Sequence, residues 1–472
     1  MTALAIFDLD RTLIAGPSGP VFQRHLAEAG VSNAPELPVL DALYKVYEVV
    51  GENPLSMQAA RLAVRGARGW SVPAVAKAAE AAAEELIESV LPYGRLLIDE
   101  HREAGRLPVL ATTSPRCFVQ PLADRLGMGE VFATEWATDG DVYNGHLHGR
   151  FLWGRNKMTA IKAWAREHKV DLGASYAYSD SVYDVPMLRT VGHPVAVNPD
   201  AQLAMVARLN QWPIRHFDVP PGVVKIAGRE LQDWLRPLNR PEMAANARFD
   251  IQGAENIPKE GAAIVVFNHR SYFDSSAINF TLAKTDRPAR FLGKKEVFDA
   301  PVIGALSKMM GGIRVDRGTG SDEPLEHAIH ALEAGEMVSL APQGTIPRGP
   351  AFFDTELKGR WGAARLAHAT RAPVIPIGVW GTEKVWPRNQ RLPKMAVTEP
   401  PTITVRVGPP VELRYRSLDA DTKRIMSAIV DLLPPEAKIP HTPTDEELAL
   451  TYPPGYNGDP TQEIDRRPGT DT

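Results

Sequence analysis

A run of apolar residues near the start of the chain ends in two carboxylates, and this pattern constrains the fold more than any other. Residues 3–7 read Ala-Leu-Ala-Ile-Phe and lead directly into residues 8–12, which read Asp-Leu-Asp-Arg-Thr. A short apolar run is typical of a strand in a parallel sheet covered on both faces. Alternate residues of an extended segment point the same way, so Asp8 and Asp10 can converge on one Mg²⁺ and one phosphate, although Asp10 could offer its carbonyl instead. The pattern predicts an α/β fold with a phosphoryl-transfer site.

The two carboxylates alone leave a second interpretation open, a solvated turn at the end of a strand. Three further segments favour the phosphoryl-transfer interpretation because they follow in the right order. Residues 107–111 form another apolar run that ends at Thr112, and Ser114 followed by Pro115 is suited to begin a helix. Thr112 is therefore expected where a hydroxyl group and helix amides can hold a phosphate.

Lys157 and a second pair of carboxylates supply the remaining charges. Lys157 begins a helical stretch that extends to Glu167, and its ammonium could neutralise a phosphoryl group, although a single lysine more often lies at the surface. Residues 175–179 predict a third strand, followed by Asp180 and Asp184. Carboxylates at the ends of two strands need a cation between them, so we expect this second pair to complete a Mg²⁺ site.

With these four motifs in place, residues 1–215 resemble the haloacid dehalogenase superfamily of phosphatases, in the branch that includes the phosphoserine phosphatases. The resemblance implies a Rossmann-like domain in which Asp8 is the nucleophile that forms an aspartyl-phosphate, while Asp10 is first the general acid and then the general base. It also implies that Thr112 and Lys157 bind phosphate. The implied metal is Mg²⁺, and its candidate ligands are Asp8, Asp10, Asp180 and Asp184.

An Ala- and Glu-rich stretch, clearest at residues 72–91, resembles the helical cap that this branch inserts between its first two motifs. We expect the cap at about residues 16–95 and substrate specificity within it. Two motifs depart from the phosphoserine phosphatase pattern. The second motif reads Thr-Thr-Ser at residues 112–114, where Ser-Gly-Gly is usual. The fourth motif reads Ser-Asp-Ser-Val-Tyr-Asp at residues 179–184, where Gly-Asp-Gly-x-Asn-Asp is usual. The substrate of the phosphatase is therefore left open.

A second signature begins with the strand-like residues 263–267, which lead into a histidine, His269, and an aspartate, Asp274. A histidine held by an aspartate is a general base for a hydroxyl group. The two side chains can touch only if the chain turns between them, as at a junction of strand and helix. A histidine followed five residues later by an unrelated capping aspartate is the alternative, and it is common by chance.

Downstream segments favour the catalytic interpretation. Residues 312–317, 341–345 and 374–378 follow in the order and spacing of the glycerolipid acyltransferase family, and the resemblance covers residues 246–436. It implies a second α/β domain that makes phosphatidate from lysophosphatidate. In that role His269 deprotonates the acceptor hydroxyl for attack on an acyl thioester, and Asp274 orients the imidazole. Arg317 with Lys294 or Lys295 would receive the acceptor phosphate. Our further candidate binding residues are Gln343, Gly344, Thr345 and Arg348.

The third acyltransferase motif departs from the family pattern at two positions. The family usually reads Phe-Pro-Glu-Gly-Thr-Arg, whereas Gln343 replaces the glutamate here and Ile346 occupies the place of the arginine. Arg348 stands two residues later. A glutamine keeps the shape and the hydrogen bonds of glutamate but loses its charge, so it should not repel a phosphate. The identity of the acceptor is left open.

The length of 472 residues suits two or three domains, and 44% hydrophobic with 23% charged residues is typical of a globular protein. A net charge of -4 gives no indication of nucleic-acid binding.

The single cysteine, Cys117, excludes an intramolecular disulfide and suits a reducing compartment. Asp8 and Asp10 interrupt any apolar core of a signal peptide, and uncharged stretches are far shorter than the ~20 residues of a spanning helix.

Two segments flank the acyltransferase region. Residues 216–245 predict an amphipathic linker helix whose apolar stripe includes Val223 and Trp234; a membrane anchor and a packed linker both explain it. Residues 437–472 are rich in Pro, Asp, Thr and Gly, which predicts a disordered tail.

Within the acyltransferase domain, an acyl-chain slot and ordinary core packing both explain one set of apolar residues, Phe298, Val302, Ile303, Leu306, Met309 and Met310.

Together these observations predict a bifunctional enzyme of phospholipid biosynthesis. It would transfer an acyl group from acyl-CoA or acyl-carrier protein to lysophosphatidate, and its Mg²⁺-dependent phosphatase domain would hydrolyse a phosphomonoester. We expect it in the cytoplasm, peripheral on the inner face of the cell membrane. The alternative is an acyltransferase for another phosphorylated or lipid acceptor, with the phosphatase-like domain acting as a regulatory or binding module.

Overall fold

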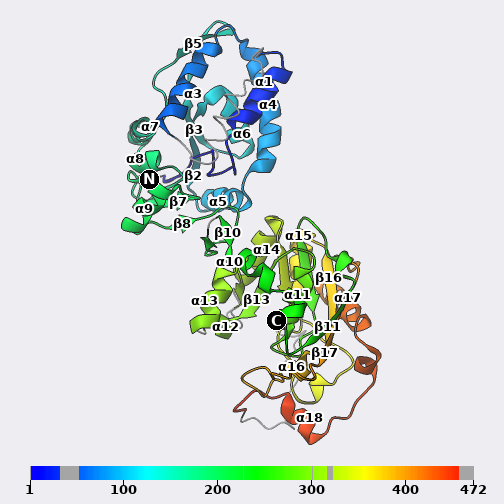
Figure 1. Ribbon diagram of the computed structural model, residues 1–472. Helices are drawn as coiled ribbons and strands as arrows, with labels where there is room; N and C mark the ends of the chain where they lie inside the picture. Colours follow the sequence, from blue (N-terminus) through cyan, green and yellow to red (C-terminus); the bar gives the residue numbers. More distant parts are fainter. Residues whose placement is uncertain (1, 32–52, 227, 300, 316–322, 457–472) are drawn as a thin grey trace. The chain divides into compact units, whose positions relative to one another are not determined.

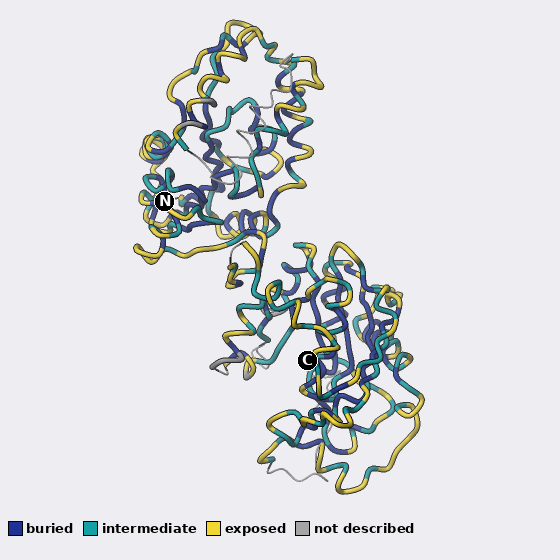
Figure 2. Tube along the Cα trace, in the orientation of Figure 1, coloured by how far each residue is buried: buried dark blue, intermediate teal, exposed yellow. Residues whose placement is uncertain are grey.

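The computed structural model describes residues 2–31, 53–226, 228–299, 301–315 and 323–456. The chain divides into two compact units, Met1–Pro221 and Gly222–Thr472 (Figure 1). Each unit has its own sheet and its own core, and buried residues follow the strands of both sheets (Figure 2). Both units are α/β, as the sequence predicts. No helix in the described ranges is long and apolar enough to cross a membrane.

The sheet of the first unit is entirely parallel and has the strand order β3-β2-β1-β6-β7-β8. The predicted strands at residues 3–7, 107–111 and 175–179 are present. Because β1 lies between β2 and β6, their carboxyl ends meet at one edge of the sheet. The bounds are β1 Leu4–Phe7, β2 Leu107–Pro115, β3 Glu130–Thr134, β6 Tyr176–Ser179, β7 His193–Val197 and β8 Ile214–Arg215.

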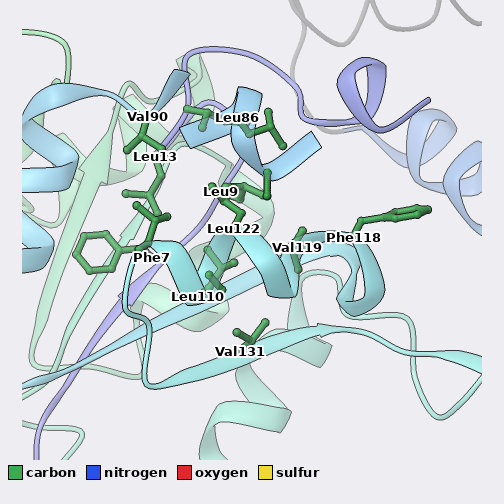
Figure 3. Packing of buried hydrophobic residues seen from close by; sticks show 14 of the residues in the cluster. Phe7, Leu9, Leu13, Leu86, Val90, Leu110, Phe118, Val119, Leu122 and Val131 are labelled. Carbon is green, nitrogen blue, oxygen red and sulfur yellow. The ribbon is translucent and has the colours of Figure 1, made fainter. Parts of the chain in front are cut away.

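The two faces of this sheet are covered by different helices. Ala5 and Phe7 belong to one buried cluster, which includes side chains of α4, α5 and α6 (Figure 3). Leu4 and Ile6 belong to another, which includes side chains of α7, α8 and α9. This alternation explains why β1 is apolar at every position. The bounds are α4 Val72–Leu86, α5 Pro92–Glu103, α6 Arg116–Arg125, α7 Arg155–Glu167, α8 Val185–Leu188 and α9 Ala201–Leu209.

Helices α1 (Gly19–Glu28), α3 (Pro54–Gly66) and α4 lie between β1 and β2 in the chain, where the helical cap is expected. An antiparallel hairpin, β4 (Trp136–Asp139) with β5 (Val142–Leu147), packs against α3. Helix α4 packs on α1 and on α6. Figure 1 shows these elements on the opposite side of the first unit from β7 and β8.

The second unit has a seven-stranded sheet in the order β11-β17-β16-β12-β15-β13-β14. Its pairs are parallel except β16 with β17. The predicted strand at residues 263–267 is the central β12, and residues 374–378, the last of the segments that resemble the acyltransferases, lie in the neighbouring β16. The strand bounds are β11 Arg248–Gln252, β12 Ala263–Phe267, β13 Ala289–Lys294, β14 Ile313–Val315, β15 Met337–Leu340, β16 Val374–Trp380 and β17 Thr402–Val407.

Helices cover both faces of this second sheet. Val265 and Phe267 pack into a cluster with side chains of α11, whereas Ile264 and Val266 pack with side chains of α14, α15 and α17. The helix bounds are α11 Asp274–Ala283, α12 Lys295–Asp299, α13 Pro301–Met309, α14 Glu323–Glu333, α15 Gly362–Thr370, α16 Thr382–Val385 and α17 Leu418–Asp431.

The predicted linker helix is wrong for most of its length. Residues 225–226 and 229–230 pair as a small antiparallel hairpin, β9 (Lys225–Ile226) with β10 (Arg229–Glu230), and α10 covers only Leu231–Leu235 before the 3₁₀ turn Arg236–Leu238. Gly228, with φ +78°, permits the turn of the hairpin. Glu230 then caps α10 and forms an ion pair with the buried Arg290 of β13, at 2.6 Å. The segment therefore folds as part of the second unit.

The predicted disorder of residues 437–472 is also wrong up to residue 456, and residues 457–472 lie outside the described ranges. Helix α18 (Asp445–Leu450) begins with a capping box at Thr444. The hydroxyl of Thr451 accepts a hydrogen bond from the backbone N–H of Gly349 at 2.9 Å, and Tyr452 is buried. These long-range contacts supply order that local composition does not predict.

Candidate functional site

The site of the first unit is centred on a buried lysine. Lys157 lies in the first turn of α7, after Gly154 with φ +56°, and its side chain is fully buried. Its ammonium lies 2.7 Å from Oδ1 of Asp8 and 2.8 Å from Oδ2 of Asp184. The hydroxyl of Ser179 donates a second hydrogen bond to Oδ2 of Asp184, at 2.8 Å. The first, third and fourth motifs therefore meet, and Lys157 is no surface residue.

Asp8 and Asp180 also share the hydroxyl group of Thr12. Its oxygen lies 3.5 Å from Oδ2 of Asp8 and 3.4 Å from Oδ1 of Asp180. The guanidinium of Arg11 forms an ion pair with Oδ2 of Asp180 at 3.3 Å. Sequence reasoning named neither Arg11 nor Thr12 as a functional residue, although both follow the carboxylate pair directly.

Asp10 occupies an environment that favours its protonated form. Burial raises the pKa of its carboxyl above the ordinary value, against the opposing effects of hydrogen bonds with Ser18 and the charge of Lys157. The backbone N–H of Ser18 donates to Oδ1 of Asp10 at 2.5 Å. A carboxyl that keeps its proton can act as a general acid. Oδ1 of Asp8, by contrast, lies 2.7 Å from the ammonium of Lys157.

Thr112 is buried within β2, three residues before the end of the strand, and its hydroxyl accepts a hydrogen bond from the N–H of Ser114 at 3.1 Å. The helix predicted to begin at Pro115 is present but begins one residue later, because β2 extends through Pro115 and α6 begins at Arg116. Pro115 has extended backbone angles and pairs with Thr134 of β3 after an irregularity in the register. Pairing with the neighbouring strand outweighs the local preference for a helix start.

The residues present are compatible with Mg²⁺. Asp8 and Asp180 approach the same hydroxyl, and the buried Oδ1 of Asp184 has no hydrogen-bond partner among the described residues. Within those ranges no group of three His, Cys, Asp or Glu side chains forms a complete metal cage. Mg²⁺ is ordinarily bound by one or two carboxylates together with waters and substrate phosphate. Two converging carboxylates are therefore sufficient.

The site of the second unit is a histidine held by a buried aspartate. Nδ1 of His269 lies 2.7 Å from Oδ2 of Asp274, which also accepts backbone hydrogen bonds from Arg270 and Ser271 at 2.7 and 2.8 Å. Oδ1 of Asp274 accepts a hydrogen bond from the hydroxyl of Thr382 at 2.5 Å. The chain turns between the end of β12 and the start of α11, which brings the two side chains together as predicted.

Gln343 contacts the main chain of the histidine. It is buried, and its Oε1 accepts a hydrogen bond from the backbone N–H of His269 at 2.7 Å. Gln343 follows β15, which pairs with β12, so the two loops emerge side by side from the sheet. The side-chain carbonyl of glutamine makes this contact without the charge that a glutamate would bring.

A cavity of about 990 Å³ opens beside His269. Predicted binding residues Lys294, Gly344 and Thr345 line it, and the Lys294 ammonium donates to the hydroxyl of Thr345 at 3.1 Å. Much of the remaining lining is apolar and includes two members of the predicted acyl-chain slot, Phe298 and Met310. Apolar walls beside a general base suit a long-chain substrate.

Several predicted residues do not join this cavity. Lys295 and Arg348 are not among the described residues that line it, and the Arg348 guanidinium lies 5.4 Å from the centroid of the Tyr456 ring. Arg317 lies outside the described residues, as do the side chains of Val302 and Ile303. Leu306 is 43% exposed. Sequence reasoning missed four arginines that do line the cavity, Arg360, Arg365, Arg388 and Arg391.

The fold and the two sites define a chain that joins a phosphate-handling α/β domain to an α/β domain with a histidine–aspartate pair. The family model of the haloacid dehalogenase-like hydrolases matches residues 5–189, and that of the acyltransferases matches residues 248–380. The chain belongs to the haloacid dehalogenase-like hydrolases through its first unit and carries an acyltransferase domain in its second.

Relatives of known name match the first unit. An "inhibition of morphological differentiation protein" of Streptomyces azureus is 35% identical over 46% of this chain and 79% of that protein. Phosphoserine phosphatase SerB1 of Mycobacterium tuberculosis is 34% identical over 48% and 74%, respectively. A histidinol-phosphatase of Neisseria meningitidis is 31% identical over 46% of this chain and all of its own length.

A solved structure also matches the second unit. It is the 1-acyl-sn-glycerophosphate acyltransferase of Thermotoga maritima, which is 23% identical over 42% of this chain and 76% of that chain, with a TM-score of 0.34.

Proposed function

We propose that the first unit hydrolyses a phosphomonoester through Asp8. The observation that supports this most strongly is the position of Lys157 between Asp8 and Asp184, because it buries a cation against the carboxylate that would attack phosphorus. Two of the relatives are named as phosphatases of phosphoserine and of histidinol phosphate, and both of these compounds are phosphomonoesters. The two compounds differ in the alcohol that carries the phosphate, so the phosphoryl group is the part that they share.

Each step of the proposed hydrolysis has a residue to carry it out. A carboxylate oxygen of Asp8 attacks phosphorus, the bond from phosphorus to the ester oxygen breaks, and Asp10 gives its proton to the departing alcohol. Asp10 then takes a proton from water as the water oxygen attacks the aspartyl-phosphate, which releases phosphate and restores Asp8. Lys157 and Thr112 hold the phosphoryl oxygens, and Mg²⁺ bound at Asp8, Asp180 and the Asp10 carbonyl would neutralise further charge. Asp184 holds Lys157 in place.

The test is hydrolysis of p-nitrophenyl phosphate with and without Mg²⁺. Asp8→Asn removes the nucleophile with little change of shape, so it should abolish phosphate release while the far-ultraviolet circular dichroism stays unchanged. Asp99→Asn is a matched control on the exposed face of α5. Undiminished hydrolysis by the Asp8→Asn protein would refute the assignment.

We also propose that the second unit transfers an acyl group to lysophosphatidate, giving phosphatidate. His269 takes the proton of the acceptor hydroxyl, the hydroxyl oxygen attacks the thioester carbonyl, and the thiol of acyl-CoA or acyl-carrier protein leaves with that proton. The supporting observation is the contact between His269 and Asp274, whose three further hydrogen bonds hold its carboxylate against the imidazole ring. His269→Ala should lower the rate of acyl transfer by about 10²–10⁴. Retention of the rate would exclude this mechanism.

We infer that the enzyme works at a lipid surface, on the cytoplasmic face of the membrane. The segment of residues 224–243 exposes apolar side chains together with arginines, and its Gln232 lines the cavity that contains His269. An apolar surface at the mouth of the cavity would let a lipid acceptor enter without crossing water. The exposed apolar residues are Val224, Ile226, Trp234, Leu238 and Met243.

A further inference from the structure

The third acyltransferase motif lacks its usual arginine, and the structure shows what lies at that place. Ile346 occupies the position and is 3% exposed, so its own side chain brings no charge to the cavity. Arg348, two residues later, is not among the described residues that line the cavity. A phosphate acceptor nevertheless needs a fork of cationic donors beside the reacting hydroxyl.

Arg388 brings a guanidinium to the main chain of residue 346. It lies after α16, and its Nη1 donates to the carbonyl of Ile346 at 2.5 Å and to that of Pro347 at 3.3 Å. Arg388 is 9% exposed and lines the same cavity as His269, Lys294 and Thr345. The two carbonyl contacts fix the plane of the guanidinium, which prepares it for a directional contact with an anion.

The charged side chains that line the cavity around Arg388 are all positive among the described residues. Among the described residues that line the cavity there is no Asp or Glu, whereas Lys294 and four arginines are present. Arg365 and Arg391 are exposed, and Arg388 is the most deeply buried of the four arginines. An ion pair formed by a buried guanidinium is screened less by water than one formed at the surface, so Arg388 is the cation with the greatest effect on a bound phosphate.

We propose that Arg388 binds the phosphate of the acceptor and replaces the arginine missing from position 346, acting together with Lys294. The inference rests on the proposed acyltransferase function and names the residue that selects a phosphorylated acceptor. Arg388 reaches the main chain of position 346 from a different segment of the chain. The competing explanation is that Arg388 only supports the loop at Ile346 and Pro347.

The experiment compares lysophosphatidate with a monoacylglycerol of the same acyl chain, using wild type, Arg388→Ala and Arg388→Lys. Arg388→Ala should raise the KM for lysophosphatidate by about ten- to a hundredfold, the loss expected for a charge-assisted hydrogen bond, with little change of kcat. Arg388→Lys should recover part of the loss because it keeps the charge without the fork. Inorganic phosphate should compete with lysophosphatidate in wild type and much less in Arg388→Ala. Lys384→Ala, an exposed change on α16, is the control.

A purely structural role predicts a different result. Loss of loop support would lower kcat for both acceptors alike and leave inhibition by phosphate unchanged, and that outcome would overturn the assignment of Arg388. If wild type transferred no acyl group to either acceptor, the proposed acyltransferase function itself would fail. The two failures are therefore distinguishable.

Discussion

At the scale of single residues, both sites are built around one buried charge held by several partners. Lys157 joins Asp8 to Asp184 in the first unit, and Asp274 accepts hydrogen bonds from four donors, one of them His269, in the second. Such groups are costly to bury and cannot lose a partner without loss of stability. Substitutions that remove one charge or one hydrogen-bond partner, while they keep the size of the side chain, therefore test the predicted roles of these residues.

Replacement of Lys157 by methionine should both abolish phosphatase activity and destabilise the first unit. It leaves the Asp8 and Asp184 carboxylates buried without their cation, and breaking a buried pair in this way costs about 3–5 kcal/mol. The double variant Lys157→Met/Asp184→Asn should recover part of the stability but none of the activity. Urea denaturation followed by circular dichroism measures the first effect. Equal stability of the single variant and wild type would show that Lys157 does not neutralise these carboxylates.

Gln343 offers a test of the unusual third motif. Gln343→Leu removes the acceptor for the His269 backbone N–H and leaves that group unsatisfied, which costs about 1–3 kcal/mol. We expect a lower kcat for acyl transfer because His269 loses its support. Gln343→Glu keeps an oxygen at the same place and should retain most of the activity. If the leucine variant were as active as wild type, the contact at 2.7 Å would have no role in positioning the histidine.

At the scale of elements, the central strands could be predicted from the sequence and the connecting segments could not. Residues 3–7 and 263–267 are apolar at every position because both faces of their strands are buried, and that signal is local. Residues 223–238 have a helical apolar pattern, yet Gly228 and the ion pair between Glu230 and Arg290 select a hairpin and a short helix. The Arg290 partner lies 60 residues away, so no local pattern contains it.

Some residues of the candidate sites could likewise be predicted from the local sequence, and others could not. Asp8 follows β1 directly and His269 lies two residues after β12, so strand pairing places both; Asp274 begins α11 after the short turn that follows His269. The sequence pattern is therefore sufficient to predict these three residues. Arg388 reaches the acyltransferase cavity by tertiary contacts with the carbonyls of residues 346 and 347, and no motif marks it.

The exposed segment of residues 224–243 gives a prediction for membrane binding. Leu238 and Met243 are 62% and 60% exposed, so Leu238→Glu/Met243→Glu should keep the fold and weaken binding to anionic vesicles by removing apolar contact and adding like charge. Co-sedimentation with phosphatidylglycerol vesicles measures this. Met205→Glu/Leu209→Glu changes two residues of similar exposure on α9 of the first unit and is the control. Equal binding by both double variants would place the lipid contact on another surface.

At the scale of the whole molecule, each site is formed by residues of one unit only, so the two units can respond separately to solution conditions. The first unit contains a buried histidine, His101, whose Nδ1 accepts from Arg106 at 2.6 Å and whose Nε2 contacts the Tyr178 hydroxyl at 2.7 Å. Burial, with the charges of Arg106 and Arg215, lowers the pKa of His101 from 6.5 to about 4.

This lowered pKa predicts acid sensitivity of the first unit. Below pH 6.5 the unfolded chain binds a proton at His101 that the folded unit does not bind until about pH 4, so stability falls as the pH is lowered between these values. The full loss amounts to about 3 kcal/mol. His101→Gln should flatten the pH dependence over this window, measured by urea denaturation at pH 7, 5.5 and 4.5. An unchanged slope in the variant would exclude His101 as its cause.

The central claim is that one chain carries two independent catalytic sites. The most direct measurement assays wild type, Asp8→Asn and His269→Ala for both activities, Mg²⁺-dependent hydrolysis of p-nitrophenyl phosphate and acyl transfer to lysophosphatidate. We predict that Asp8→Asn loses only phosphate release and that His269→Ala loses only acyl transfer. Loss of both activities in either variant, or of neither, would contradict the account.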